Sequence, residues 1–299
     1  MSAAAIWPPL RRFIVQERRL GGIMARRRWT AFLYEFLRFG IKQGWACLFG
    51  GIAVALLIAT WRFYPADAPL ARYDFLFLCM IAVQIVLLAT RLETWDEAKI
   101  IVIYHVVGTV MEIFKTSVGS WIYPELSVVR IAGVPLFTGF MYSCIGSYLC
   151  RVWRLFDFRF ERHPPRRALV ALSIAIYANF FSHHYVPDLR IALFAAAALL
   201  FARTIIYFKV WNEYRSMPLL LGLGLVTLFI WFAENIGTFT RTWLYPSQSH
   251  GWAMVSPAKF GSWFLLLIIS YTLVSLINKP RVRDVPRTTA PVMPGLETA

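Results

Sequence analysis

The sequence predicts an all-α, polytopic membrane protein with about eight transmembrane helices in two parallel repeats of four. Apolar residues make up 59% of the 299 residues and charged residues only 16%, whereas a soluble domain is nearer one quarter charged. The charges lie in short stretches between apolar runs of about 20 residues, the length that crosses a bilayer. A polar motif also recurs after 122 residues, which indicates two related halves.

The eight apolar runs follow one another with short connections, which leaves no room for a soluble catalytic domain. Four helices is an even number, so both halves have the same orientation, as in transporters built from parallel repeats. The runs cover residues 44–61, 73–90, 100–118, 131–150, 168–185, 189–208, 217–236 and 258–277.

The chain divides into five segments. Residues 1–28 are rich in Arg and Pro and are predicted to be a disordered basic arm, in which Met24 is an alternative start. Residues 29–43 have apolar side chains on one helical face, which predicts an amphipathic helix at the membrane surface. The first four-helix half covers 44–150 and the second covers 151–278. Residues 279–299 show no periodicity and are predicted to be a disordered cytoplasmic tail.

The distribution of the net charge of +15 predicts the orientation of the chain in the membrane and does not indicate nucleic-acid binding. With alternating loops assigned to opposite sides, 23 Lys and Arg residues fall on one side of the membrane and 6 on the other. Cytoplasmic loops carry the excess of positive charge, so both termini are predicted to be cytoplasmic. Membrane lipid is the expected partner of these basic segments.

The repeated motif places one carboxylate inside a membrane helix in each half. A charged side chain at membrane depth costs about 2.5–3.5 kcal/mol, so such residues usually have a function. If the helix continued, each Glu would lie about 13 Å below the Trp that follows nine residues later. The two copies are Glu112-x3-Thr116-x4-Trp121-x-Tyr123-Pro124 and Glu234-x3-Thr238-x4-Trp243-x-Tyr245-Pro246.

These residues predict a polar pocket in the outer half of the bilayer, lined by the third, fifth and seventh runs. Glu112 and Glu234 are the candidate catalytic residues, because a carboxyl group in hydrocarbon can act as a proton donor. The candidate substrate-binding residues are His105, Thr116, Trp121, Tyr123, Asn179, His183, Asn235, Thr238, Trp243 and Tyr245.

Simpler interpretations compete with this site. The two glutamates can join helices as hydrogen-bonded pairs, and Trp121 and Trp243 can anchor the chain at the interface. A metal held by His105, Glu112, His183, His184 and Glu234 is an alternative, but no metal-binding spacing such as His-Glu-x-x-His is present. We therefore predict no metal. The sequence has no phosphate-binding loop or dinucleotide fingerprint, and we predict no cofactor.

The stretch from His105 to Glu125, with Ala233 to Thr240, resembles the bacterial membrane family called domain of unknown function 817. The resemblance covers about residues 32–277 and implies a multi-pass protein of the bacterial cytoplasmic membrane, without an assigned activity. Glu234-x-x-Gly237-Thr238-x-Thr240-x4-Tyr245 is also similar to a Glu/Gly/Thr/Tyr motif of membrane carotenoid hydratases. The first copy departs from that motif with Lys115 and Val118 at the Gly and second Thr positions.

Three functions fit the sequence. The first is an intramembrane enzyme, in which one glutamate acts as general acid on a lipophilic, isoprenoid-like small molecule. The second is a proton-coupled transporter that uses the glutamate pair as its proton site. The third is a non-catalytic scaffold. An apolar pocket favours the enzyme, a polar path between both faces favours the transporter, and a packed interior favours the scaffold.

Overall fold

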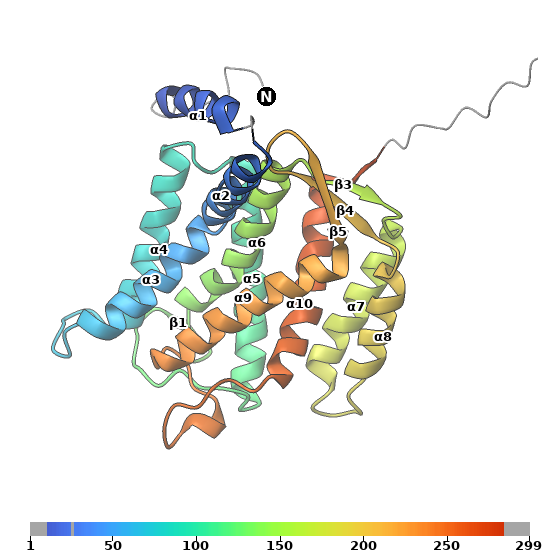
Figure 1. Ribbon diagram of the computed structural model, residues 1–299. Coiled ribbons are helices and arrows are strands. Elements are labelled where there is room, and N and C mark those ends of the chain that lie inside the picture. The colour runs from blue at the N-terminus through green and yellow to red at the C-terminus, as the bar shows by residue number, and fades with distance from the viewer. Residues whose placement is uncertain (1–10, 25–26, 284–299) are drawn as a thin grey trace, which may run out of the picture.

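The computed structural model describes residues 11–24 and 27–283 as a mostly helical molecule (Figure 1). The helices are α1 (Arg11–Met24), α2 (Arg28–Ala46), α3 (Leu48–Phe63), α4 (Arg72–Ala89), α5 (Trp95–Ser117), α6 (Phe137–Phe156), α7 (Arg166–Ser182), α8 (Arg190–Phe201), α9 (Leu219–Phe239) and α10 (Ala258–Asn278).

Several of these helices have the length and composition of membrane spans. Four of them, α4, α5, α9 and α10, are long and apolar enough to cross a bilayer. The pair α2 and α3, bent by 69° at a short break, would be a fifth span. The chain is therefore a helical membrane protein, and the eight expected runs overlap in order with the helices α3 to α10.

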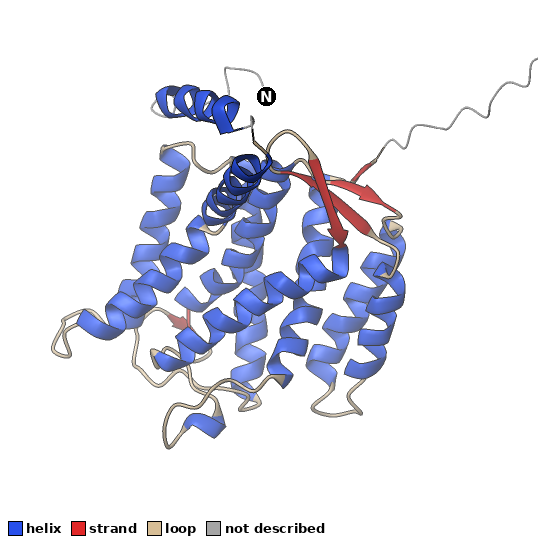
Figure 2. Cartoon of the chain, in the orientation of Figure 1, coloured by secondary structure: helices blue, strands red, loops and turns tan. Residues whose placement is uncertain are grey.

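A small sheet at one end of the helices departs from the all-α expectation (Figure 2). Its strands are β3 (Arg159–Glu161), β4 (Ile205–Lys209), β5 (Tyr214–Pro218) and β6 (Arg281–Val282), in the order β5-β4-β3-β6. The β3–β6 pair is parallel and the other pairs are antiparallel. The connections after α6 and α8 and the segment after α10 therefore meet at the same end of the molecule.

The sheet corrects two expected boundaries. The apolar run 189–208 is not one helix, because α8 ends at Phe201 and β4 follows. Its residues Ile205, Ile206, Tyr207 and Phe208 are β-branched or aromatic types that favour strands. The predicted disordered tail contains β6, which pairs with β3 through Arg281 and Val282. Residues 284–299 of that tail lie outside the described residues.

The basic N-terminal arm is also partly helical. The prediction of disorder over residues 1–28 is wrong for Arg11–Met24, which forms α1. Glu17 of this helix accepts hydrogen bonds from Tyr34 and Arg38 of α2, and this contact holds α1 against the amphipathic segment. Residues 1–10 and 25–26 lie outside the described part of the chain.

At the opposite end, the α5–α6 and α9–α10 connections lie against each other. The first connection contains a hairpin of two short strands, β1 (Arg130–Ile131) and β2 (Val134–Pro135). The second contains a short 3₁₀ turn, Pro246–Gln248. Ile122 and Leu244 join the connections as an antiparallel bridge, with N–H···O distances of 2.9 and 3.0 Å. These two residues are 122 positions apart, so equivalent points of the two motif copies pair directly.

Candidate functional site

In the first motif copy, the chain folds back on its own helix. Helix α5 ends at Ser117, and Gly119 takes a left-handed φ of 71°. The backbone N–H groups of Gly119 and Ser120 donate to the carbonyls of Thr116 and Lys115, which closes the helix with a Schellman-type turn. The residues that follow therefore run back toward Glu112.

This turn brings the aromatic residues of the motif to Glu112. The indole Nε1 of Trp121 donates to Oε2 at 2.6 Å, and the hydroxyl of Tyr123 donates to the same oxygen at 2.5 Å. The expected separation of about 13 Å between Glu112 and Trp121 is wrong, because the helix stops after Ser117. Trp121 is accordingly a hydrogen-bond donor to the glutamate, not only an interface anchor.

The second copy repeats these contacts. Helix α9 ends at Phe239, and Arg241 has a φ of 53° at the position that corresponds to Gly119. Nε1 of Trp243 donates to Glu234 Oε1 at 2.9 Å, and the Tyr245 hydroxyl donates to that oxygen at 2.5 Å. Both glutamates are buried, with 5% and 6% of their surfaces exposed.

The two copies share an aromatic wall. The ring of Trp121, the donor to Glu112, lies edge-on to the ring of Tyr245, the donor to Glu234. The two ring centroids are 6.0 Å apart. Lys259 from the first turn of α10 covers this wall, with Nζ 4.4 Å from the Tyr245 centroid and 5.4 Å from that of Trp121. A cation over aromatic faces is an attractive arrangement, so the structure supplies a positive charge between the copies.

The two carboxyl groups differ in their hydrogen bonds. Glu112 has a third donor, the Tyr142 hydroxyl, which reaches Oε1 at 2.9 Å. The position 122 residues later is Phe264, which has no hydroxyl. Glu234 Oε2 accepts no hydrogen bond from the described residues. This oxygen is not fully enclosed by the protein and keeps a small accessible surface.

A glycine allows Tyr142 to reach Glu112. The Tyr142 ring lies directly over Gly108 of α5, where an added Cβ would be 2.6 Å from the ring. The phenol can therefore cross the surface of α5 one turn before Glu112. Tyr142 also lines a narrow cavity of about 40 Å³, together with Met111 of α5 and Trp263 of α10. The side chains around this cavity are mostly apolar.

Three predicted polar residues bond to backbone or to a connection instead of to the carboxyl groups. The Thr116 hydroxyl donates to the Glu112 backbone carbonyl at 2.8 Å. Thr238 accepts the indole N–H of Trp252 at 3.1 Å. Asn235 accepts the backbone N–H of Val255 at 2.9 Å and so holds the chain before α10.

The predicted residues of the fifth run lie at the α7–α8 turn. Asn179 donates to Asp188 Oδ1 at 3.0 Å and accepts the Leu189 N–H at 2.9 Å, so it fixes that turn. His183 and His184 face Lys115 of α5, whose Nζ donates to His184 Nε2 at 2.9 Å and lies 3.5 Å from His183 Nε2.

His105 packs elsewhere on α5. Its ring lies 4.5 Å from the Phe140 ring of α6, and its Nδ1 is buried without a partner. In the described part of the chain, no three His, Cys, Asp or Glu side chains gather closely enough to hold a metal ion. The histidines and glutamates of the alternative metal site are thus not brought together as ligands.

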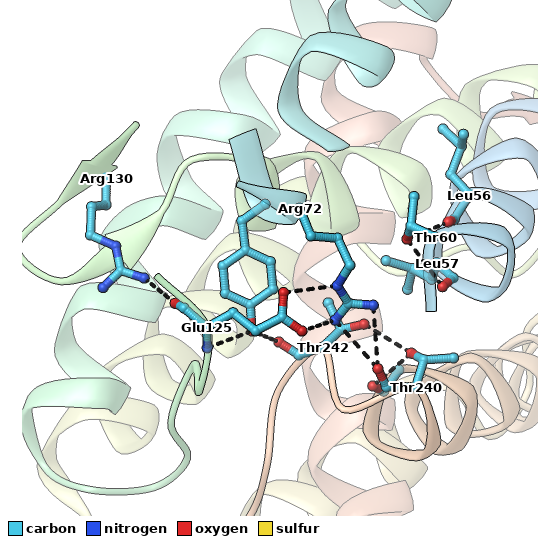
Figure 3. Close-up of polar contacts among 10 residues, drawn as sticks. Leu56, Leu57, Thr60, Arg72, Glu125, Arg130, Thr240 and Thr242 are labelled. Carbon is cyan, nitrogen blue, oxygen red and sulfur yellow. Dashed lines mark hydrogen bonds and ion pairs between the residues drawn. The ribbon is translucent and has the colours of Figure 1, made fainter. Parts of the chain in front are cut away.

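Residues that the sequence analysis missed hold the two motif connections in place (Figure 3). Arg72 forms an ion pair with Glu125 at 2.7 Å, and the neighbouring Tyr73 donates to the Thr242 carbonyl at 2.8 Å. The Asp74 carboxylate accepts two backbone N–H groups, from Val128 and Val129, at 2.8 Å each. These residues open α4 and have no counterpart in the repeated motif. Tyr142, the third donor to Glu112, could have been found from the sequence, because the 122-residue offset aligns it with the aromatic residue Phe264.

Comparison with known proteins gives the family of this chain. The family model described as "Protein of unknown function (DUF817)" matches residues 35–271. The chain belongs to the DUF817 family. This DUF817 protein is also 39% identical over 245 residues to "Uncharacterized protein YoaT" of Bacillus subtilis (strain 168), an alignment that covers 82% of the chain and 92% of YoaT. The family suggested by the sequence is therefore confirmed, and no solved structure matches the DUF817 protein.

Proposed function

We propose that this DUF817 protein is an intramembrane enzyme in which Glu234 transfers a proton to or from a lipophilic, isoprenoid-like substrate. The observation that carries the proposal is the unequal use of the two carboxyl groups. Glu112 has donors on both oxygens, whereas Glu234 Oε2 accepts no hydrogen bond from the described residues. A general acid or base needs such a free oxygen within reach of the reacting atom.

The surroundings of the two glutamates support separate roles. Glu112, held by Trp121, Tyr123 and Tyr142, is fixed in position. A fixed carboxylate in a site of low dielectric stabilises positive charge that develops on a substrate. The side chains around the narrow cavity beside Tyr142 and Trp263 are mostly apolar, as expected near a lipophilic substrate.

The test compares lipid extracts from cells that carry the wild type, Glu234→Gln or Glu112→Gln. Glutamine keeps the shape of the side chain and removes the proton that titrates. We expect Glu234→Gln to reduce product by at least about 100-fold, the usual contribution of a general acid. Glu112→Gln should retain part of the activity, because its amide still accepts hydrogen bonds from the aromatic donors.

A matched pair of variants changes which glutamate has a tyrosine hydroxyl as its third hydrogen-bond donor. Phe264→Tyr introduces the hydroxyl that Glu234 lacks and should reduce activity, because the free oxygen becomes occupied. Tyr142→Phe frees Glu112 in the same way and should affect activity less than Glu234→Gln. Wild-type activity in a protein with both glutamates replaced by Gln would refute the enzyme proposal. It would favour a scaffold, which the complete hydrogen bonding of Glu112 already fits.

Proton-coupled transport uses the same feature in another way, since a carboxyl group with a free oxygen can also bind and release a transported proton. Proteoliposomes that contain a pH-sensitive dye separate the two functions. Proton flux that depends on Glu234, without any change in lipid composition, would assign the protein as a transporter.

We further propose that α3 to α10 form two halves of four membrane helices, α3–α6 and α7–α10, in the bacterial cytoplasmic membrane with both termini in the cytoplasm. The equivalent contacts of the two motif copies support the repeat. The excess of Lys and Arg in the segments that form the sheet supports the orientation. Helix α8, with 12 residues, is the shortest of the eight and reaches only part of the way across.

A further inference from the structure

A second cavity lies at the end of the molecule where the motif connections meet. It is a cleft of about 510 Å³ between the α3–α4 connection, the residues after Tyr123 and the end of α9. This volume is in the range of small-molecule sites. The cleft differs from the cavity beside Tyr142 in its lining, which includes charged side chains.

Arg72 is the buried charged group of this cleft, with 8% of its surface exposed. Its Nε and Nη2 atoms face the two oxygens of Glu125 at 2.9 and 2.7 Å, and its guanidinium also donates to the Thr240 carbonyl at 3.3 Å (Figure 3). Parallel donors of this kind match a carboxylate or a phosphate group equally well. Glu125 is about one-third exposed, so it is the movable member of the pair.

The charges of the cleft favour an anionic ligand. Arg72 and Arg241 are positive and Glu125 is the negative side chain of the lining, so one positive charge remains uncompensated. Arg241 is exposed at the rim. The walls carry Trp61 and Tyr64 at the end of α3, and aromatic residues at such helix ends mark the level of lipid headgroups.

We propose that this cleft binds a phosphate-bearing ligand, with the phosphate on Arg72 and Arg241. Without a ligand, the Glu125 carboxylate pairs with the two parallel N–H donors of Arg72. It is displaced from them when the phosphate binds. The phosphate can come from a lipid headgroup or from a soluble phosphate ester. This site is independent of Glu234, and its test uses binding instead of lipid turnover.

The experiment measures binding by calorimetry with the full-length protein in a phosphate-free, non-ionic detergent. The probes are dihexanoyl phosphatidic acid and glycerol 3-phosphate. We expect Arg241→Gln to weaken binding about tenfold, the effect of about 1.4 kcal/mol. The matched control is Arg62→Gln, which removes an exposed arginine at the same end of α3 that does not line the cleft, and it should leave binding unchanged.

Glu125→Gln gives the sharper result. It keeps a hydrogen-bond acceptor for Arg72 but removes the competing charge, so phosphate should bind about tenfold more tightly. Binding of the lipid probe alone identifies a membrane lipid as the source, and equal binding of both probes identifies a soluble ester. Absence of binding to both the wild type and Glu125→Gln would overturn the site, as would equal losses in Arg241→Gln and Arg62→Gln.

Discussion

At the scale of single residues, the two motif copies solve the same problem with different neighbours. Trp243 of the second copy packs against Gly237, where an added Cβ would lie 2.0 Å from the indole ring. The equivalent position in the first copy is Lys115, whose side chain turns away to His183 and His184. The glycine is therefore a local requirement of the second copy, because it lets the indole reach Glu234.

We expect Gly237→Ala to lower the thermal stability of the purified protein. The methyl group would displace the Trp243 ring, and overpacking of this kind costs about 1–3 kcal/mol. Gly224→Ala, in the same helix with open space around the glycine, is the control and should be neutral or slightly stabilising. Thermal unfolding in detergent measures both, and equal melting temperatures for the two variants would contradict the packing argument.

At the scale of elements, the sheet is joined to the helices by His163 between β3 and α7. Its Nε2 lies 2.8 Å from the Tyr271 hydroxyl of α10, and its Nδ1 lies 2.9 Å from the Pro164 carbonyl. Since a carbonyl only accepts, Nδ1 carries a proton, and in the neutral ring Nε2 accepts from the Tyr271 hydroxyl. Protonation of Nε2 replaces this acceptor with a second donor in a buried position.

The stability of this junction should depend on pH. Burial lowers the pKa of His163 below its ordinary value, so the folded state binds its proton less readily than the unfolded state. The stabilisation is present above the unfolded pKa of about 6.5 and is lost as the pH falls toward the folded value. The melting temperature should thus fall between about pH 7.5 and about pH 5.

His163→Gln should make that pH dependence shallower, whereas His250→Gln, at an exposed position of the α9–α10 connection, should preserve it. An unchanged slope in His163→Gln would assign the pH dependence to other groups.

At the scale of the whole molecule, the proposed orientation predicts which surfaces face outward. Val128 and Ser249 are exposed in the connections after α5 and α9, and Ser216 is exposed in β5 at the opposite end. Single cysteines at Val128 and Ser249, in a protein without its native cysteines, should react with a membrane-impermeant maleimide in intact cells. A cysteine at Ser216 should react only after permeabilisation. The reverse pattern would invert the orientation.

The sequence predicted the helical segments better than the site. Long apolar runs place α3 to α10 because each helix forms its backbone hydrogen bonds internally. The hydrogen bonds to Glu112 and Glu234 depend instead on where α5 and α9 stop. Two residues that are nine positions apart in sequence lie about 13 Å apart in a helix. After the left-handed turn at Gly119, Trp121 and Glu112 are in direct contact.

The strands of the sheet were not predicted, because their conformation also depends on contacts that the local sequence does not show. The apolar run that begins in α8 continues into β4 without a polar break, and hydrophobicity alone does not distinguish a short buried strand from a helix. Pairing with β3, which is distant in sequence, and with β5 across a short turn decides the conformation of β4. Asn179 bonds to Asp188 and His183 lies near Lys115 of α5, and depth in the membrane alone does not distinguish these partners from the glutamates.

The position of the donors to Glu112 also bears on how the protein is made. Trp121, Tyr123 and Tyr142 all follow Glu112 within the first half of the chain. Domains fold from the N-terminus during synthesis, so this carboxyl group can complete its hydrogen bonds before the second half leaves the ribosome. The Ile122–Leu244 bridge forms only when the second connection arrives. In the proposed arrangement of two halves, the hydrogen bonds around Glu112 thus form before the second motif copy docks against the first.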